Sequence, residues 1–305
     1  MPLVTSKELL QAALEGHFAV GAFNANNMEQ IQGIIDAAVE EQSPVILQVS
    51  QGAIDYAGLS YASTMVKVAA QEANVPVVLH LDHGSSFEQN VICLRAGFTS
   101  LMFDGSKLPY EDNVRITKQI VEMCTPVGIP VEAELGKVLQ SRDNVSEDEV
   151  RAAMTDPDQA RQFVEETGIS SLAVAVGSVH AMTSADAELD IERMKALREK
   201  VDIPMVLHGS SGAREDSIVE AIQYGICKIN VATQLNMAFV GAIKQASVDM
   251  PDNVDPRKWL SLGRDALKEV VRHKMRTFGS SGQATSSGFA SPAKSFRTAE
   301  LGHLE

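Results

Sequence analysis

The chain has 305 residues, of which 45% are hydrophobic and 22% are charged, so it can bury a sizeable core and is not disordered as a whole. Its 40 acidic and 26 basic residues give a formal net charge of -14, which argues against a polyanion or an anionic membrane as a general partner. The sequence therefore predicts no nucleic-acid binding and no membrane association, and any phosphate group must be bound locally.

The chain also lacks the usual signals for export and for thiolate chemistry. Its apolar runs are all shorter than the roughly 18 to 20 residues of a membrane span, and its first residues lack the basic start of a signal peptide. We therefore expect a cytoplasmic protein. Cys93, Cys124 and Cys227 are too widely spaced for a disulfide framework or a CxxC metal site. Any metal site is expected to use histidines and carboxylates.

Eight short apolar runs recur along the chain, and segments of helical periodicity follow them. The runs cover residues 19–24, 45–50, 77–82, 100–104, 131–136, 171–177, 205–209 and 228–233. Runs of this kind are typical of parallel strands that are buried on both faces. Eight strand–helix units in roughly 250 residues predict an α/β fold of the (β/α)8 barrel class, the TIM barrel.

The alternative architecture is an open doubly wound sheet. Such a sheet usually carries a GxGxxG turn after its first strand, whereas residues 24–29 read NANNME, which favours the barrel. Helical patterns at 235–248 and 260–278 predict a C-terminal helical extension. We expect residues 1–279 to form a single domain, and residues 280–305, rich in Ser, Gly and Ala, to form a flexible tail.

Polar residues stand at the ends of the predicted strands, where the loops of a barrel build its active site. One such residue alone would more often be a turn or a helix cap, but their convergence indicates a site. They are Asn24, Ser50, Asp82, His83, Asp104, Glu132, Glu134, Ser178, His180, His208, Asn230 and Thr233.

Three histidines in this set suggest a metal centre. His83, His180 and His208 would face one another across the barrel mouth. Three neutral imidazoles suit a tetrahedral zinc ion that keeps its fourth position open. Asp104 and Glu134, at neighbouring strand ends, are candidates to orient these ligands or to offer a second cation position.

The segment HGSSG at 208–212 predicts an anion site. It places Gly209 and Ser211 between the seventh strand and a helix that begins near Glu215. Backbone N–H groups, a hydroxyl and a helix N-terminus together bind phosphate, and barrels often do so after strands seven and eight.

Two other residues are expected to take no direct part in the chemistry. His80 lies on the same strand face as Asp82 and is expected to be a core histidine or to support the ligands. Lys228 begins the eighth run, and we expect it far from the mouth, which argues against a Schiff-base mechanism.

These segments resemble the class II, zinc-dependent ketose-bisphosphate aldolases, which include fructose- and tagatose-1,6-bisphosphate aldolases. GAFNANNME, HLDHGSSFE, VEAELG, LAVAVGSVH, HGSSG, KINVAT and DPRKWL occur in the family's order and spacing, over about residues 1 to 283. The resemblance implies reversible aldol cleavage of fructose 1,6-bisphosphate to dihydroxyacetone phosphate and glyceraldehyde 3-phosphate. It also implies one catalytic Zn2+ on the three histidines, with room for a monovalent cation, Na+ or K+.

The resemblance also assigns roles to single residues. Asp82 would be the acid and base at the C4 hydroxyl of the sugar. Arg257, in DPRKWL, would reach the far phosphate from a neighbouring subunit, which implies a homodimer or homotetramer. The positions that match substrate or phosphate contacts are Asn24, Ser50, Ala181, Gly209, Ser211, Asn230 and Thr233.

Three positions depart from the family pattern. Arg142 stands where a glutamate normally exchanges a proton on the dihydroxyacetone phosphate carbon, so Asp143 is expected to take that role. Ala181 replaces a glycine, and Ala232 replaces an aspartate found in many fructose enzymes. Two alternatives therefore stay open: a tagatose-1,6-bisphosphate aldolase, and a sugar-phosphate-binding barrel with impaired catalysis.

Overall fold

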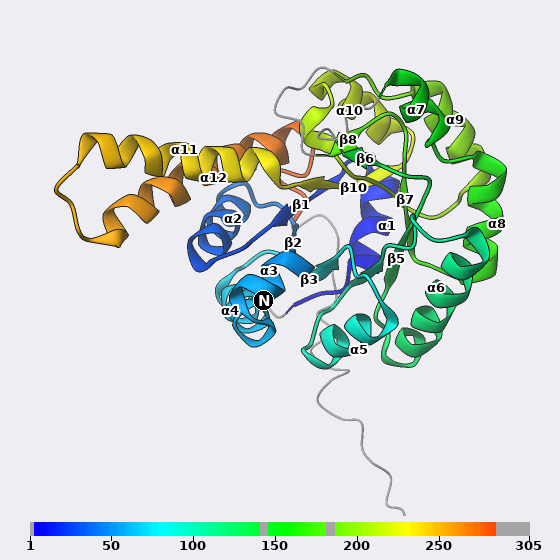
Figure 1. Ribbon diagram of the computed structural model, residues 1–305, viewed down its shortest axis with the longest axis horizontal. Coiled ribbons are helices and arrows are strands. Elements are labelled where there is room, and N and C mark those ends of the chain that lie inside the picture. The colour runs from blue at the N-terminus through cyan, green and yellow to red at the C-terminus, as the bar shows by residue number, and fades with distance from the viewer. Residues whose placement is uncertain (1–2, 141–145, 181–186, 285–305) are drawn as a thin grey trace, which may run out of the picture.

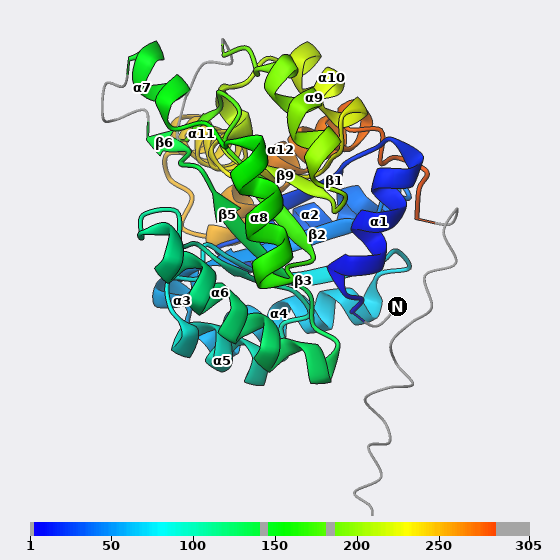
Figure 2. The same cartoon turned by 90° about the vertical axis from the view of Figure 1, so that its right-hand side faces the viewer.

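The structure is a computed structural model that describes residues 3–140, 146–180 and 187–284, and it shows a barrel of parallel strands (Figures 1 and 2). The barrel strands are β1 (Val20–Asn24), β2 (Val45–Ser50), β3 (Val77–Asp82), β4 (Leu101–Phe103), β5 (Val131–Leu135), β7 (Ser171–Val174), β9 (Met205–Leu207) and β10 (Ile226–Val231). Their order is β3-β2-β1-β10-β9-β7-β5-β4, with every pair parallel.

The ring of strands closes between β3 and β4. His80 and Ser100 form a parallel bridge there, and the N–H of Leu81 donates to the carbonyl of Ser100 at 3.1 Å. The predicted (β/α)8 barrel is therefore confirmed, with each barrel strand lying in one of the eight apolar runs or overlapping it.

The eighth strand corrects one expectation. β10 begins at Ile226, because Ile226 and Cys227 are apolar and buried and extend the strand by two residues. Lys228 therefore lies within the strand and not at its start. The alternation of side chains along a strand turns Lys228 to the inside of the barrel, where it is fully buried.

Helices cover the outside of the barrel, since the outward Val, Ile and Leu side chains of the strands require an apolar partner. They are α2 (Met28–Glu40), α3 (Gln51–Ala57), α4 (Leu59–Glu72), α5 (Phe87–Arg95), α6 (Tyr110–Cys124), α7 (Glu147–Ala152), α8 (Pro157–Thr167), α9 (Ile191–Lys200) and α10 (Glu215–Gln223). Most helices begin at a side-chain cap, as Asn27 accepts from the N–H of Gln30 at the start of α2.

The N-terminal helix α1 (Ser6–Gly16) seals the other end of the barrel. Its Leu9 and Leu10 side chains are buried in one cluster with Cys227 of β10 and with Val20 and Val78, which point into the barrel from β1 and β3. This apolar layer closes the floor, so the polar residues inside the barrel open only toward the C-terminal ends of the strands.

Two short strands form a second, smaller sheet. β6 (Leu139–Gln140) follows β5, β8 (Val179–His180) follows β7, and the two pair in parallel. Asp143 and Ala181 follow these strands in the sequence and lie outside the described residues.

A helical hairpin of α11 (Thr233–Asp249) and α12 (Pro256–Thr277) follows the barrel and projects well beyond it (Figure 1). α12 packs closely on α2, because a Cβ on Gly33 would lie 2.9 Å from the carbonyl oxygen of Arg264. The predicted helical extension is confirmed. No helix within the described ranges is long and apolar enough to span a membrane.

The chain after α12 turns back onto α2. The Ser280 hydroxyl is buried and lies 2.8 Å from that of Ser43, and the N–H of Gly282 donates to the carbonyl of Glu41 at 2.8 Å. Residues 280–284 of the predicted tail, 280–305, therefore pack against the end of α2, whereas residues 285–305 lie outside the described residues.

Candidate active site

Asp82, at the end of β3, is held by two neutral amides. Asn24 on β1 donates to its Oδ2 at 2.8 Å, and Asn230 on β10 donates to its Oδ1 at 3.2 Å. Behind them, the buried Gln48 donates to Oδ1 of Asn24 at 2.6 Å. Burial by itself would raise the pKa of Asp82, but the charges of His83 and Lys228 outweigh it and lower the pKa below its usual value. Asp82 is thus a buried, ionised carboxylate in a fixed orientation.

His83 follows β3 with a left-handed backbone, at φ 52°. The next residue, Gly84, packs directly on β4, where a Cβ would lie 2.3 Å from the carbonyl oxygen of Met102. This contact brings His83 beside Asp104, whose Oδ2 lies 2.8 Å from Nδ1 of the imidazole. The hydroxyl of Ser106 donates to the other oxygen of Asp104 at 2.7 Å. The turn at the end of β3 therefore places His83 against a carboxylate that is itself held.

His208, at the end of β9, is fully buried between two carboxylates. Its Nε2 lies 3.1 Å from Oε1 of Glu132, and its Nδ1 lies 3.2 Å from Oε2 of Glu134. The rings of His83 and His208 meet edge to face with their centroids 4.7 Å apart.

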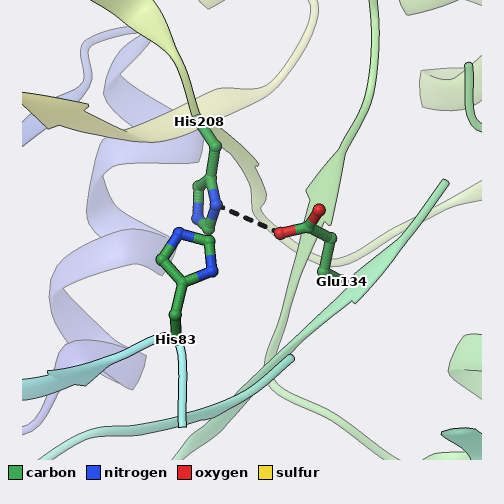
Figure 3. A group of neighbouring side chains, drawn as sticks. All are labelled: His83, Glu134 and His208. Carbon is green, nitrogen blue, oxygen red and sulfur yellow. Dashed lines mark ion pairs between the residues drawn. The ribbon is translucent and has the colours of Figure 1, made fainter. Parts of the chain in front are cut away.

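Figure 3 shows His83, Glu134 and His208 converging from three different strand ends. Their ligand atoms all lie within 4.8 Å of one another. Burial by itself would lower the pKa of His83, but Asp82 and Asp104 raise it to about 10. The cluster therefore attracts positive charge, and two imidazoles with a carboxylate are a donor set that suits zinc.

A second polar group lies one layer deeper in the barrel. Nζ of Lys228 is 3.1 Å from Oε1 and 3.0 Å from Oε2 of Glu132. His80 lies beside them, with Nε2 3.7 Å from Oε2 of Glu132 and Nδ1 2.8 Å from the Ser100 hydroxyl. Burial and the charge of Lys228 lower the pKa of His80 to about 3 and keep it neutral. His80 is a core histidine, as expected.

Above these groups opens a cavity of about 630 Å³ at the C-terminal ends of the strands. Most of the predicted site residues within the described ranges line it. They are Asn24, Ser50, Asp82, His83, Asp104, Glu134, Gly209, Ser211, Asn230 and Thr233. His208 lies directly beneath, fully buried.

The helix that the sequence predicted beside the anion site does not reach the cavity. Residues Ser210–Gly212 form a short 3-10 turn at the cavity wall, and the Ser210 hydroxyl donates to the carbonyl of Asn230 at 2.5 Å. The helix whose N-terminus reaches the cavity is α11, through Thr233, and not α10. α10 begins with two acidic residues, Glu215 and Asp216, outside the cavity lining.

The described part of the structure does not place several predicted residues in the site. Arg257 is 89% exposed, pairs with Asp255 in the first turn of α12, and is not among the residues that line the cavity. Asp143 and Ala181, with Arg142, lie outside the described residues. His180 ends β8, but its side chain also lies outside the described part of the chain.

Sequence reasoning missed two cations at the mouth. Lys107 and Lys137 both line the cavity. Each stands a few residues after a strand, Lys107 after β4 and Lys137 after β5, and that position was the signal that could have identified them. They add positive charge to a mouth that is otherwise acidic.

Comparisons with known proteins agree with this geometry. The family model described as "Fructose-bisphosphate aldolase class-II" matches residues 4–283. The chain is 47% identical over 287 residues to the fructose-bisphosphate aldolase of Geobacillus stearothermophilus, covering 93% of this chain and 99% of that protein. It is 43% identical to the one of Thermus caldophilus, covering 92% and 100%. The crystal structure of the YdjI aldolase from Escherichia coli K12 superposes with a TM-score of 0.82 at 39% identity, covering 92% of this chain and 99% of that one.

Proposed function

The chain belongs to the class-II fructose-bisphosphate aldolase family, and from this premise we propose that it catalyses the zinc-dependent, reversible cleavage of fructose 1,6-bisphosphate to dihydroxyacetone phosphate and glyceraldehyde 3-phosphate. One observation carries the proposal. The ionised Asp82 carboxylate, fixed by two amides, lines the same cavity as the cluster of His83, Glu134 and His208.

In this proposal the zinc ligands are His83 and His208, together with His180, and Glu134 offers a further donor. When bound, zinc supplies Lewis-acid polarisation of the substrate carbonyl. Asp104 orients His83, and Glu132 orients His208, so each ring turns one nitrogen to a carboxylate and the other toward the cluster. A monovalent cation, Na+ or K+, near these carboxylates stays a prediction.

Asp82 is proposed to take the proton from the C4 hydroxyl during cleavage and to return it during condensation. Its depressed pKa keeps the carboxylate ionised and ready to accept a proton at neutral pH. Asn24 and Asn230 fix both of its oxygens, so its position does not depend on bound substrate. The proton exchange on the dihydroxyacetone phosphate carbon is assigned to Asp143, which stays a prediction.

The phosphates are proposed to bind at the rim of the cavity. Ser50, Gly209, Ser211 and Thr233 offer hydroxyl and backbone donors there, at a wall that includes the N-terminus of α11. Ala181 stays a predicted contact of the substrate or its phosphate. Lys107 and Lys137 supply the positive charge that a bisphosphate needs in this acidic chain.

We further propose a homodimer or homotetramer, in which the hairpin of one subunit reaches the site of another. The hairpin projects from the barrel and carries exposed apolar side chains, among them Met237, Val240 and Leu262. Arg257 lies on this hairpin, away from the cavity of its own chain, so a role at a neighbour's cavity is its proposed function. The cytoplasmic location stays a prediction.

An assay of triose phosphate release tests the reaction. We expect zinc-loaded protein to cleave fructose 1,6-bisphosphate, chelator-treated protein to lose this activity, and Asp82→Ala to be at least about 100-fold slower with its zinc content unchanged. Asp112→Ala, which removes an exposed carboxylate on α6, is the matched control. Faster cleavage of tagatose 1,6-bisphosphate would favour that sugar as the substrate. Zinc-loaded protein that cleaves neither sugar would refute the proposed reaction.

A further inference from the structure

A buried ion pair between Lys228 and Glu132 lies beneath the proposed zinc site, and of the two residues only Glu132 has a role in the proposed chemistry. Lys228 and Glu132 are both almost completely shielded from solvent, and the ammonium contacts both carboxylate oxygens, at 3.1 and 3.0 Å. Replacing such a pair with apolar residues of similar volume is often neutral or stabilising. A contribution to fold stability is therefore a weak explanation for the presence of this ion pair. The residues around it suggest a different role.

We propose that Lys228 is a positioning residue for the metal ligand His208 and acts through Glu132. Oε1 of Glu132 faces both the Lys228 ammonium, at 3.1 Å, and Nε2 of His208, also at 3.1 Å. Both ring nitrogens of His208 face a carboxylate, and a neutral imidazole carries one proton. When Nδ1 gives its lone pair to a metal ion in the cluster, that proton is on Nε2, where the Glu132 carboxylate accepts it. Nδ1 faces Glu134 at 3.2 Å, inside the metal cluster.

Lys228 is needed because Glu132 has a competing partner. Nε2 of His80 lies 3.7 Å from Oε2 of Glu132, while the other nitrogen of His80 is engaged with the Ser100 hydroxyl. Without the ammonium, the carboxylate is free to turn toward His80, and His208 then loses the acceptor that fixes its proton and its ring plane. Lys228 holds the carboxylate by both oxygens and prevents this rotation.

The other histidine of the cluster is held by the same arrangement. Asp104 accepts from His83, and Ser106 donates to Asp104, so this carboxylate also has a residue behind it that fixes its orientation. Each imidazole ring thus has a carboxylate partner, and a further residue supports that carboxylate. For His208 that support is Lys228.

The test compares zinc affinity, measured by competition with a chromogenic chelator, in the wild type and in Lys228→Met. The control is Lys274→Met, which removes a largely buried lysine that pairs with Glu215, away from the cavity. We expect Lys228→Met to bind zinc about 10- to 100-fold more weakly, and the control to stay within about 2-fold of the wild type. With Co2+ in place of zinc, the visible absorption bands should shift in Lys228→Met and not in the control.

The inference rests on the proposed zinc site, and the two can fail separately. A wild type without zinc affinity would refute the proposed site itself. A wild type that binds zinc, with Lys228→Met binding equally tightly, or with both lysine variants equally weakened, would overturn the role of Lys228 alone.

A pair of charge-neutral double variants covers the case in which Lys228→Met does not fold. Glu132→Gln with Lys228→Met keeps an acceptor for His208, whereas Glu132→Leu with Lys228→Met does not. We expect the glutamine variant to bind zinc at least about 10-fold more tightly. Equal affinities would overturn the inference.

Discussion

Nδ1 of His83 lies 2.8 Å from Oδ2 of Asp104, so the carboxylate that follows β4 fixes the ring that follows β3. The same contact helps to hold the pKa of Asp104 below its usual range, although burial acts in the opposite direction. The turn at Gly84 allows this contact, because it packs the chain directly beside the end of β4. The N–H of Asp104 donates to the carbonyl of Gly84 there, at 2.9 Å. The proposed metal ligand His83 and the carboxylate of Asp104 are thus joined through both side chain and backbone.

The first prediction concerns Asp104. Asp104→Asn should weaken zinc binding about 10-fold or more, because a neutral amide holds the Nδ1–H of His83 less strongly than a carboxylate does. Competition with a chelator measures the change, and Asp112→Asn on the exposed face of α6 is the control. Unchanged zinc affinity in Asp104→Asn would show that the contact does not support the ligand.

The second prediction concerns Gly84. Gly84→Ala should destabilise the fold by about 2 to 4 kcal/mol, since its Cβ would meet the backbone of β4 at 2.3 Å and force the closing strands apart. Denaturant unfolding measures the loss, and zinc content should fall with it. Gly241→Ala is the control, because nothing lies within 4 Å of a Cβ there, and it should be neutral or stabilising by up to about 1 kcal/mol. Equal stability of the two variants would contradict the proposed packing.

The third prediction concerns Gln48, which acts on Asp82 through Asn24. Gln48→Leu should lower kcat about 10-fold or more with little change in zinc content, because Asn24 loses the donor that turns its own amide toward Asp82. Gln162→Leu, at an exposed position on α8, serves as the control. If kcat is retained, the second amide, from Asn230, is sufficient to hold the carboxylate.

The strands and the polar residues at their ends could be predicted from the sequence, since an apolar run followed by a polar residue is a local pattern. The pairing of Glu132 with Lys228 could not, because the two residues are 96 positions apart and meet only when the barrel closes. The start of β10 was misplaced by two residues, and this error placed Lys228 at the start of its strand instead of within it. Which nitrogen of His208 faces which carboxylate also depends on packing across the barrel and has no local signal.

The fourth prediction concerns the pH dependence of stability. Glu41, at the end of α2, accepts hydrogen bonds from Arg276, Arg272 and Ser281. The bond from Arg276 is the main reason that its pKa falls from 4.5 to about 2, against the opposing effect of burial. Since the folded pKa is depressed, this stabilisation is fully present above pH 4.5 and is lost as the pH falls toward 2.

Glu41→Gln should therefore destabilise the fold by about 1 to 2 kcal/mol at pH 7, a value reduced for the solvent exposure of the arginines. The difference from the wild type should shrink in unfolding experiments near pH 3. Glu165→Gln, in an exposed pair with Arg161, should change stability by less than about 0.5 kcal/mol. The same loss for Glu41→Gln at both pH values would rule out the ion pairs as its cause.

The last prediction concerns Arg257, which is exposed on the hairpin and does not line the cavity of its own chain. If it acts at a neighbour's cavity, Arg257→Ala should raise KM for the bisphosphate without affecting zinc content. Mixed subunits of Arg257→Ala and Asp82→Ala should then regain activity at low substrate. In random dimers half of the molecules are mixed, and one of their two sites is intact, so about 25% of the wild-type activity is expected.

The control for this mixing experiment is Asp82→Ala with His208→Ala. Both residues belong to the site of one chain, so every mixed dimer has a defect in each of its sites and should remain inactive. Recovery in the first mixture and not in the second assigns Arg257 to the neighbouring cavity. If neither mixture recovers although subunits exchange, Arg257 serves its own chain or none, and the proposed sharing of sites between subunits is wrong.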